Sequence, residues 1–186
     1  MSQYLLAQRL WPAAQASLGR NAILAVMGSL LVAAAAQVAV PMVPVPMTLQ
    51  TLAVLAIGAA YGSRLGAATL ALYALEGAIG LPVFAEMKSG VMLVSFGYVL
   101  GFIAAAWLVG RLAERGWDKS VFSMFAAMLA GAAVLYVPGL LWLAVWIGSF
   151  SKAIAFGLVP FIAGDLVKAA IAALGFPAIW SLLGRR

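Results

Sequence analysis

The chain has 186 residues, of which 66% are hydrophobic and only 9% are charged, against roughly 45–50% and 25% in an ordinary soluble domain. These proportions exclude a soluble globular protein, because so few polar side chains cannot cover a surface in water, and they exclude a disordered chain. The lack of Cys and His removes disulfides, thiolate chemistry, Ser-His-Asp catalysis and His-based metal sites. We therefore expect a membrane protein with several spans that is not an enzyme and holds no metal or cofactor.

The net charge of +6 does not indicate a nucleic-acid partner, because the Arg and Lys residues lie in the connections between apolar runs. Basic residues in such connections are typical of the cytoplasmic side of a membrane protein. We expect the chain in the inner, or plasma, membrane of a bacterium, where membrane lipids surround it.

Residues 1–21 precede the first long apolar run. Nothing in this stretch resembles the cleavage site of a signal peptide. Apolar side chains recur in it at every fourth position, namely Leu6, Leu10, Ala14 and Leu18. This spacing predicts an amphipathic segment that lies on the inner membrane surface.

The remaining residues, 22–186, are expected to form a single all-α transmembrane domain. A transmembrane helix needs about 20 apolar residues. In chain order the six predicted spans are 22–40, 47–61, 65–79, 95–111, 120–137 and 160–183. The fifth span is expected to end at Pro138. The stretch 140–157 is apolar but interrupted by Gly, Ser and Lys, so we expect a broken helix or a re-entrant cover on the outer face.

The distribution of basic residues favours six spans with both termini inside. This topology places most of them on the inner side: Arg9, Arg20, Arg64, Arg111, Arg115, Lys119, Arg185 and Arg186. Only Lys88 and Lys152 then fall in outer connections. A seventh span through 140–157 would move the last two arginines outside and weaken this bias.

Two opposite charges lie inside the last apolar run. Asp165 and Lys168 follow Pro160 by five and eight residues, which places them about 7 and 12 Å along a helix. Their spacing puts them on one helix face, and each would cost roughly 2.5–3.5 kcal/mol in contact with lipid. They therefore face the protein interior, either as an ion pair that only joins helices or as part of a ligand site open to the outer face. We favour the ligand site, because Lys168 lies too deep to reach the interface easily.

Further polar and aromatic residues fall at the same outer level. Glu76 either pairs locally or reaches the same cavity, and Gln50 either satisfies a helix end or contacts the ligand. Aromatic side chains at this level are typical of the interfacial belt, but a few are expected to wall an apolar pocket. The candidates for that wall are Phe84, Tyr98 and Trp142.

Small residues recur at four-residue spacing in the first span. Ala25, Ser29 and Ala33 lie on one face of the predicted helix, where they allow another helix to approach closely. That helix belongs either to this protein or to a separate membrane partner that docks here.

Six short segments, spread in order over nearly the whole chain, carry a resemblance to a known family. They are 45–51 (VPMTLQT), 62–66 (GSRLG), 76–85 (EGAIGLPVFA), 97–102 (GYVLGF), 136–139 (YVPG) and 164–168 (GDLVK). Together they resemble BioY, the biotin-binding S component of energy-coupling-factor (ECF) vitamin transporters.

The resemblance implies a six-helix S-component bundle that binds biotin in a pocket open to the outer face. Asp165 and Lys168 match the GD-x-x-K pattern of the family, and Lys88 stands where many members have a basic residue in a loop. The ureido group of biotin is expected at Asp165, and the carboxylate at Lys168 or Lys88. The small-residue track of the first span matches the face on which such components dock a partner.

The resemblance also bears on how transport is energised. The sequence contains no GxxxxGK[ST] motif, and the family implies a coupling membrane subunit with partner ATPase subunits. Two alternatives stay open from the residues alone. One is an S component for another vitamin or small molecule, and the other is a structural membrane subunit that does not transport.

Overall fold

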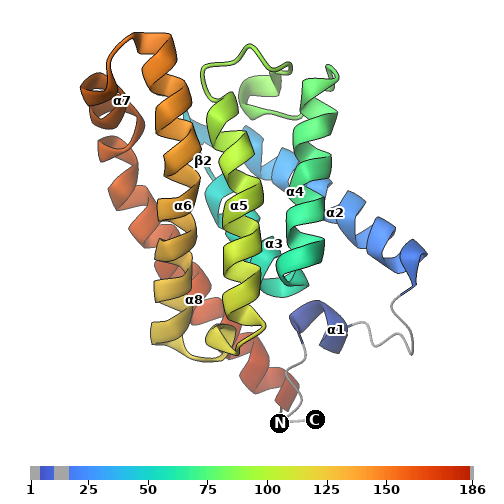
Figure 1. Ribbon diagram of the computed structural model, residues 1–186. Helices are drawn as coiled ribbons and strands as arrows, with labels where there is room; N and C mark the ends of the chain where they lie inside the picture. Colours follow the sequence, from blue (N-terminus) through green and yellow to red (C-terminus); the bar gives the residue numbers. More distant parts are fainter. Residues whose placement is uncertain (1–4, 11–16, 185–186) are drawn as a thin grey trace.

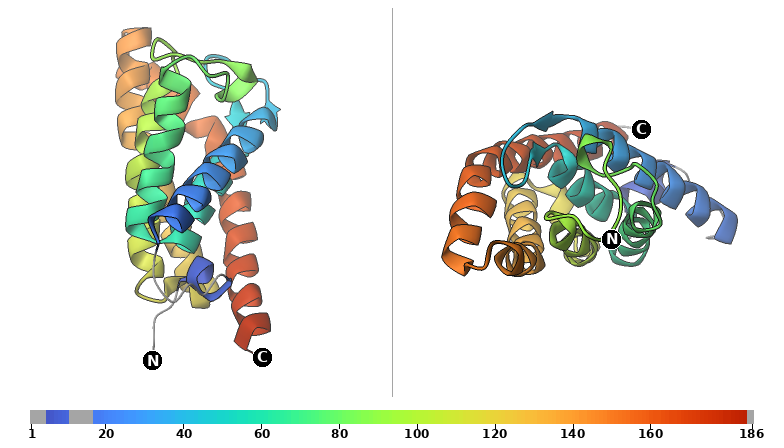
Figure 2. Two further views of the ribbon diagram at one scale, coloured as in Figure 1. Left: turned by 90° about the vertical axis from the view of Figure 1, so that its right-hand side faces the viewer. Right: turned by 90° about the horizontal axis from the view of Figure 1, so that it is seen from above.

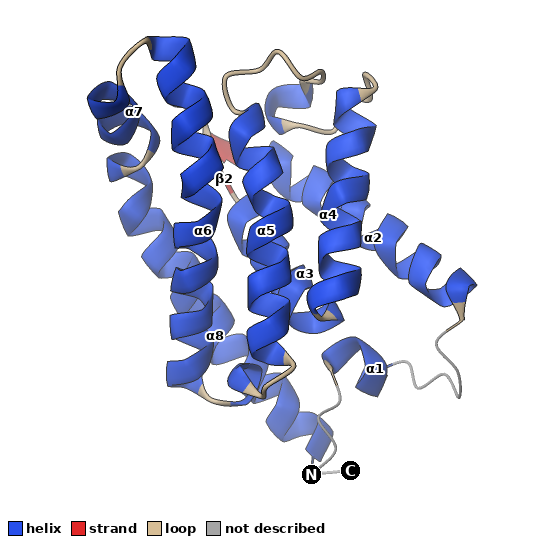
Figure 3. Ribbon diagram, in the orientation of Figure 1, coloured by secondary structure: helices blue, strands red, loops and turns tan. Residues whose placement is uncertain are grey.

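The computed structural model describes residues 5–10 and 17–184, and most of them are helical (Figures 1 and 3). The elements are α1 (Leu6–Leu10), α2 (Leu18–Gln37), β1 (Ala39–Val40), β2 (Met47–Thr48), α3 (Gln50–Tyr61), α4 (Ser63–Ala78), α5 (Phe96–Ala113), α6 (Val121–Ile147), α7 (Phe150–Gly157) and α8 (Ile162–Gly184). Short 3-10 turns at Ala85–Met87, Trp117–Lys119 and Val159–Phe161 join some of them.

The longest helices have the length and the apolar composition that are typical of a protein that crosses the membrane several times. Within the described ranges, four helical stretches are both long and apolar enough for this: Leu18–Gln37, Phe96–Ala113, Val121–Ile147 and Phe150–Gly184. The helices α3 and α4 have 12 and 16 residues, or about 18 and 24 Å, which is less than the roughly 30 Å of a bilayer core. The count of six spans and their orientation stay predictions.

The helices α4, α5 and α6 form one row, and α2, α3 and α8 form a second (Figure 2, right). The helix α5 is central, since it packs along α6, α3 and α4. Glycines permit this close approach: a Cβ on Gly58 in α3 would lie only 2.5 Å from the backbone oxygen of Ala106 in α5. The first long helix, α2, crosses α3 and α4 obliquely (Figure 2, left).

The prediction that the fifth span ends at Pro138 is wrong. The helix α6 continues through Pro138 to Ile147. Proline removes one backbone hydrogen bond, but a transmembrane helix tolerates it where neighbouring helices enclose the site. Here Gly97 and Gly101 of α5 let the α6 backbone around Pro138 approach closely. The helix ends at Gly148, which has a φ of 71°, a left-handed conformation that suits glycine.

The stretch 140–157 is a broken helix, as expected, and the break lies at Gly148 and Ser149. Residues 140–147 complete α6, and the short helix α7 follows Gly148. The side chain of Ser149 caps α7 by accepting a hydrogen bond from the N–H of Lys152. Figure 1 shows α7 at the end of the bundle opposite α1. We refer to these two ends as the α7 end and the α1 end.

The N-terminal stretch is only partly described. Its helix α1 has five residues, and α2 already begins at Leu18, capped by the Ser17 side chain. Ala14 of the predicted apolar repeat lies outside the described residues. The placement of 1–21 at the membrane surface therefore stays a prediction.

A small hairpin connects α2 to α3 at the α7 end. Its two short antiparallel strands pair Ala39 with Thr48 and Val40 with Met47. The proline-rich sequence does not predict strands there. This hairpin brings Thr48 and the start of α3 to the top of the bundle, where the candidate site lies.

Candidate ligand-binding site

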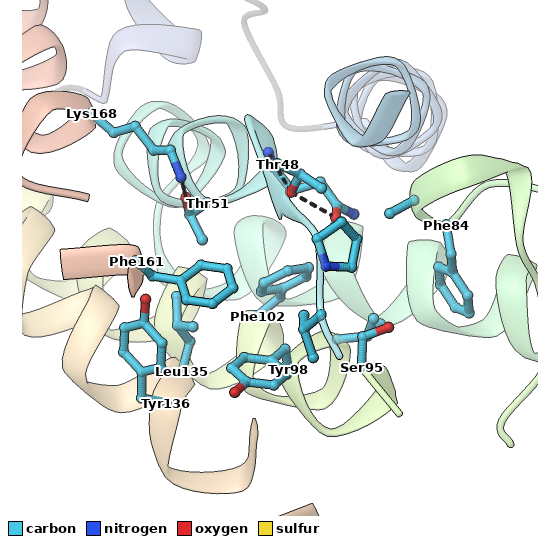
Figure 4. A pocket seen from close by; sticks show the side chains of 15 residues that line it. Thr48, Thr51, Phe84, Ser95, Tyr98, Phe102, Leu135, Tyr136, Phe161 and Lys168 are labelled. Carbon is cyan, nitrogen blue, oxygen red and sulfur yellow. Dashed lines mark hydrogen bonds between the residues drawn. The ribbon is translucent and has the colours of Figure 1, made fainter. Parts of the chain in front are cut away.

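A cavity opens at the α7 end, between the hairpin segment and the helices α3, α5, α6 and α8 (Figure 4). Its volume is about 50 Å³, well below the roughly 300–1,000 Å³ that is usual for ligand pockets, so the side chains that line it must move apart to admit a ligand. The lining residues are Val45, Pro46, Thr48, Gln50, Thr51, Phe84, Ala85, Ser95, Tyr98, Val99, Phe102, Leu135, Tyr136, Phe161 and Lys168.

Aromatic rings form much of the wall. Tyr98 and Tyr136 meet edge to face with ring centroids 6.0 Å apart, and the Tyr98 hydroxyl donates to the backbone oxygen of Gly157 at 2.9 Å. That bond ties α5 to the last residue of α7 and fixes the ring. Phe102 and Phe161 complete this side of the cavity (Figure 4). Such a wall suits a compact apolar ring system.

Phe84 closes the other side of the cavity. Its ring is only 2% exposed and meets Tyr73 edge to face at 5.4 Å. It lies directly over Gly77, where any Cβ would collide with the ring. The backbone oxygen of Phe84 accepts a hydrogen bond from Gln37 at 3.1 Å. These contacts hold the connection between α4 and α5 in place at the cavity.

The charged centre of the site is a four-residue network. Lys168 Nζ donates to Asp165 Oδ1 at 3.1 Å and to Thr51 Oγ1 at 2.7 Å. Asp165 Oδ1 also accepts from the Thr51 hydroxyl at 3.3 Å, and Asp165 Oδ2 accepts from Tyr136. The side chains of Lys168 and Asp165 are only 11% and 9% exposed. The network joins α3, α6 and α8.

Only one member of the ion pair reaches the main cavity. Lys168 lines it, whereas Asp165 lies behind Lys168 and lines a smaller cavity next to Leu55 and Met128. An ammonium group has three N–H donors, and Asp165 and Thr51 engage two of those of Lys168. The third is available to a ligand. Because Asp165 already neutralises Lys168, the pair adds no net charge to the pocket.

A second polar group lies at the start of α3. Gln50 Nε2 donates to the Tyr73 hydroxyl at 2.6 Å, and Thr48 donates to Gln50 Oε1 at 3.0 Å. The Tyr73 hydroxyl donates in turn to the Val83 backbone oxygen at 2.9 Å. Gln50 is therefore a buried, oriented amide that lines the cavity and also holds the connection after α4.

Of the predicted ligand-binding residues, Lys168, Gln50, Phe84 and Tyr98 line the cavity, and Asp165, Lys88, Glu76 and Trp142 do not. Lys88 is exposed and pairs with Glu86 two residues away, which keeps its charge at the surface. Trp142 donates from its indole N–H to the Leu93 backbone oxygen at 2.9 Å, so it fastens the connection before α5.

The small-residue track on α2 faces inward at its centre. Ser29 is fully buried, and its hydroxyl donates to the carboxylate of Glu76 on α4. This bond explains why Glu76 does not reach the cavity. Ser29 therefore packs inside this protein, and docking of a partner on this face of α2 stays a prediction. Ala25 and Ala33 are half-buried.

Several lining residues were not selected from the sequence, among them Thr51, Ser95, Phe102, Leu135, Tyr136 and Phe161. A signal existed for Thr51, which stands beside Gln50, and for Tyr136, which begins the YVPG segment. Phe102 had the same kind of signal, since it ends the GYVLGF segment. Leu135 and Phe161 had none, because an inward-facing apolar side chain in an apolar run looks the same as one that faces lipid.

Comparison with known proteins decides the family. The model of the BioY family matches residues 8–185. The chain belongs to the BioY family. It is 37% identical to the biotin transporter BioY of Thermotoga maritima, over 83% of this chain and 92% of that protein. It is 38% identical to the biotin transporter BioY of Rhizobium etli, over 71% and 76% of the two chains.

The fold of this BioY chain is also known. A crystal structure described as the S component for biotin from an ECF-type ABC transporter superposes with a TM-score of 0.77 and 21% identity. The match covers 88% of this chain and 92% of that one. The resemblance expected from the short segments is thus confirmed at the level of family and fold.

Most of those segments converge on the cavity. Val45, Phe84, Tyr98, Tyr136 and Lys168 each line it, and each comes from a different one of the six segments. The exception is 62–66, which lies at the junction of α3 and α4, towards the α1 end. The segments that carry the family resemblance are therefore mainly the segments that build the pocket.

Proposed function

We propose that this BioY chain is the substrate-binding subunit of a biotin uptake system and captures biotin in the cavity at the α7 end, facing the outside of the cell. The observation that carries the proposal is an aromatic cavity with one buried lysine on its wall. Membership of a family whose relatives are named biotin transporters supports biotin as the ligand. The fused rings of biotin would occupy the aromatic part of the cavity.

The charge balance favours one orientation of biotin. Lys168 is already neutralised by Asp165 at 3.1 Å, so a carboxylate beside it would leave one negative charge uncompensated in a buried site. A neutral acceptor carries no such cost. The ureido oxygen of biotin therefore accepts a hydrogen bond from the third N–H of Lys168, and the carboxylate of biotin points to the mouth of the cavity. Asp165 and Thr51 act as positioning residues that hold the ammonium group towards the ligand.

Transport across the membrane needs an energy source outside this chain. The proposed partners are a coupling membrane subunit and a pair of ATPase subunits. The description of the similar solved structure, an S component from an ECF-type ABC transporter, supports partners of this kind. In this scheme the chain catalyses no covalent reaction, and the membrane is the cytoplasmic one.

Binding of labelled biotin to the purified full-length chain tests the proposal. Biotin should bind and raise the Tm, whereas riboflavin and thiamine should do neither. Asp165→Asn and Lys168→Ala should weaken binding at least about tenfold, since each disrupts a charge-assisted contact of about 1.4 kcal/mol or more. Lys88→Ala is the matched control and should change the Kd less than about twofold, because Lys88 does not line the cavity. Wild-type affinity in both site variants would contradict the assignment.

Two biotin analogues test the orientation. Biotin amide lacks the carboxylate charge and should bind almost as well as biotin. Iminobiotin replaces the ureido carbonyl with an imino group, which removes the oxygen acceptor and adds a cation near Lys168, so it should bind far more weakly. The reverse ranking would place the carboxylate at Lys168.

A further inference from the structure

A second cavity lies at the α1 end, far from the proposed biotin site. It is enclosed by α1, the first turn of α2, the junction of α3 and α4, and the end of α5. Figure 1 shows α1 below the junction of α3 and α4, with the start of α2 to its right and the end of α5 to its left. Its volume of about 380 Å³ exceeds the roughly 30 Å³ share of one water molecule in the liquid.

The lining of this cavity is strongly basic. Arg20, Arg64 and Arg111 line it, against the single acidic residue Glu114. Glu114 is already engaged: its Oε1 accepts from the N–H and hydroxyl of Ser63 at 2.8 and 2.7 Å, and its Oε2 pairs with Arg111 at 2.9 Å. The charges of Arg20 and Arg64 therefore remain uncompensated by any described carboxylate within 4.0 Å.

Arg20 is buried without a full set of partners. Its residue is only 9% exposed, and its Nη2 donates to the Ala7 backbone oxygen at 3.0 Å. Its Nε is buried and has no hydrogen-bond acceptor among the described residues. A buried guanidinium N–H without an acceptor is costly, so the Arg20 side chain, which lines the cavity, carries a positive charge that the described residues do not fully satisfy.

The residues around the cavity suit a lipid ligand better than a soluble anion. Leu18 and Ile23, on the same part of α2, are 90% and 49% exposed. The cavity lies where apolar helices end, which is the level of phospholipid headgroups in a multi-pass membrane protein. The acyl chain of a phospholipid would cover the exposed apolar side chains of α2, and its phosphate would lie among the arginines of the cavity.

We propose that the α1-end cavity is a binding site for the phosphate headgroup of an anionic phospholipid. Guanidinium groups suit phosphate because their planar N–H pairs match its oxygens. Basic pockets between transmembrane helices are a known way to hold such headgroups. The site is independent of the biotin cavity, and it fastens α1 and α2 to the ends of α3, α4 and α5.

Lipid titration of the full-length chain in detergent tests this site. Phosphatidylglycerol should bind and raise the Tm, and phosphatidylcholine at the same concentration should have less than a tenth of its affinity. Arg20→Gln and Arg64→Gln should each weaken phosphatidylglycerol binding at least fivefold. Arg115→Gln is the matched control, because Arg115 is exposed at the same end but does not line the cavity. It should change the affinity less than twofold.

Other outcomes overturn the proposal. An equal loss in Arg115→Gln would mean that only the overall positive charge attracts the lipid. Inorganic phosphate that binds as tightly as phosphatidylglycerol would assign the site to a soluble anion. Arg64 is exposed, so Arg64→Gln should fold and keep its affinity for biotin even if Arg20→Gln does not. Unchanged lipid binding in a folded Arg64→Gln variant would exclude the site.

Discussion

The hydroxyl of Tyr136, on α6, donates a hydrogen bond to Oδ2 of Asp165, on α8. The other oxygen of that carboxylate accepts from Lys168 and Thr51. One buried carboxylate therefore joins α3, α6 and α8, and it orients both the Tyr136 ring and the Lys168 ammonium group on the cavity wall. In the proposed site, this carboxylate holds the pocket in shape and does not touch the ligand.

Tyr136→Phe should destabilise the chain more than Tyr98→Phe. The first removes a hydrogen bond to a buried carboxylate, worth about 1.5–3 kcal/mol, and the second removes one to a backbone carbonyl, worth about 1 kcal/mol. Tyr98 is the matched control, since both rings line the same cavity and they meet edge to face. Unfolding midpoints of the ligand-free protein in one detergent measure the difference. A larger loss in Tyr98→Phe would contradict this role of Asp165.

Removal of one member of the ion pair should cost more than removal of both. Lys168→Met leaves the Asp165 carboxylate buried without its cation, which should destabilise the chain by about 3–5 kcal/mol. The double variant Asp165→Asn, Lys168→Met should lose less than Lys168→Met alone, and so less than the sum of the two single variants, because no charge is left unpaired. A double-mutant cycle on unfolding free energies without biotin measures this coupling. Strict additivity would mean that the two charges do not interact.

The sequence predicted the centre of the site because charge inside an apolar run is a local signal. Asp165 and Lys168 are three residues apart, and both the lipid cost and the shared helix face follow from that spacing. Glu76 is also a charge inside an apolar run, but it bonds Ser29 and does not reach the cavity. Its partner Ser29 lies 47 residues away on another helix, and nothing near Glu76 in the sequence indicates it.

The course of α6 shows why local rules fail at helix ends. Proline followed by glycine normally ends a helix, and this rule placed the end ten residues too early, at Val137 rather than Ile147. The glycines of α5 that accommodate the region around Pro138 are Gly97 and Gly101, which lie more than 30 residues earlier. Packing between distant segments therefore decided the length of the helix.

Two glycines should respond to alanine in opposite ways. A Cβ at Gly58 would meet the backbone of Ala106, with its oxygen at 2.5 Å and its Cα at 2.9 Å, so α3 and α5 would have to move apart. Gly58→Ala should destabilise the chain by about 1–3 kcal/mol.

Gly175, within α8, has no atom within 4 Å of such a Cβ. Gly175→Ala should be neutral or stabilising by up to about 1 kcal/mol. Thermal unfolding of both variants checks the contrast, and an equal loss in both would contradict it.

Glu114 should make the stability of the α1 end depend on pH. Burial alone would raise the pKa of the Glu114 carboxyl, but the hydroxyl and N–H of Ser63 and the guanidinium of Arg111 outweigh burial and hold this pKa below its ordinary value of 4.5. The folded state then binds the proton more weakly than the unfolded state. The stabilisation is complete above the ordinary pKa and is lost as the pH falls through the lowered one.

Glu114→Gln should therefore have a lower Tm than the parent chain near neutral pH, and the difference should shrink towards zero in acid, because the parent carboxyl becomes neutral there. The matched control is Glu86→Gln at the α7 end, where the carboxylate is exposed and pairs only with Lys88 at the surface. It should change the Tm little at any pH, since exposed pairs contribute little. Tm measured against pH for the three proteins, in detergent without anionic lipid, checks this. A Glu114→Gln deficit that is constant down to strongly acidic pH would show that the carboxylate charge is not what stabilises the start of α4.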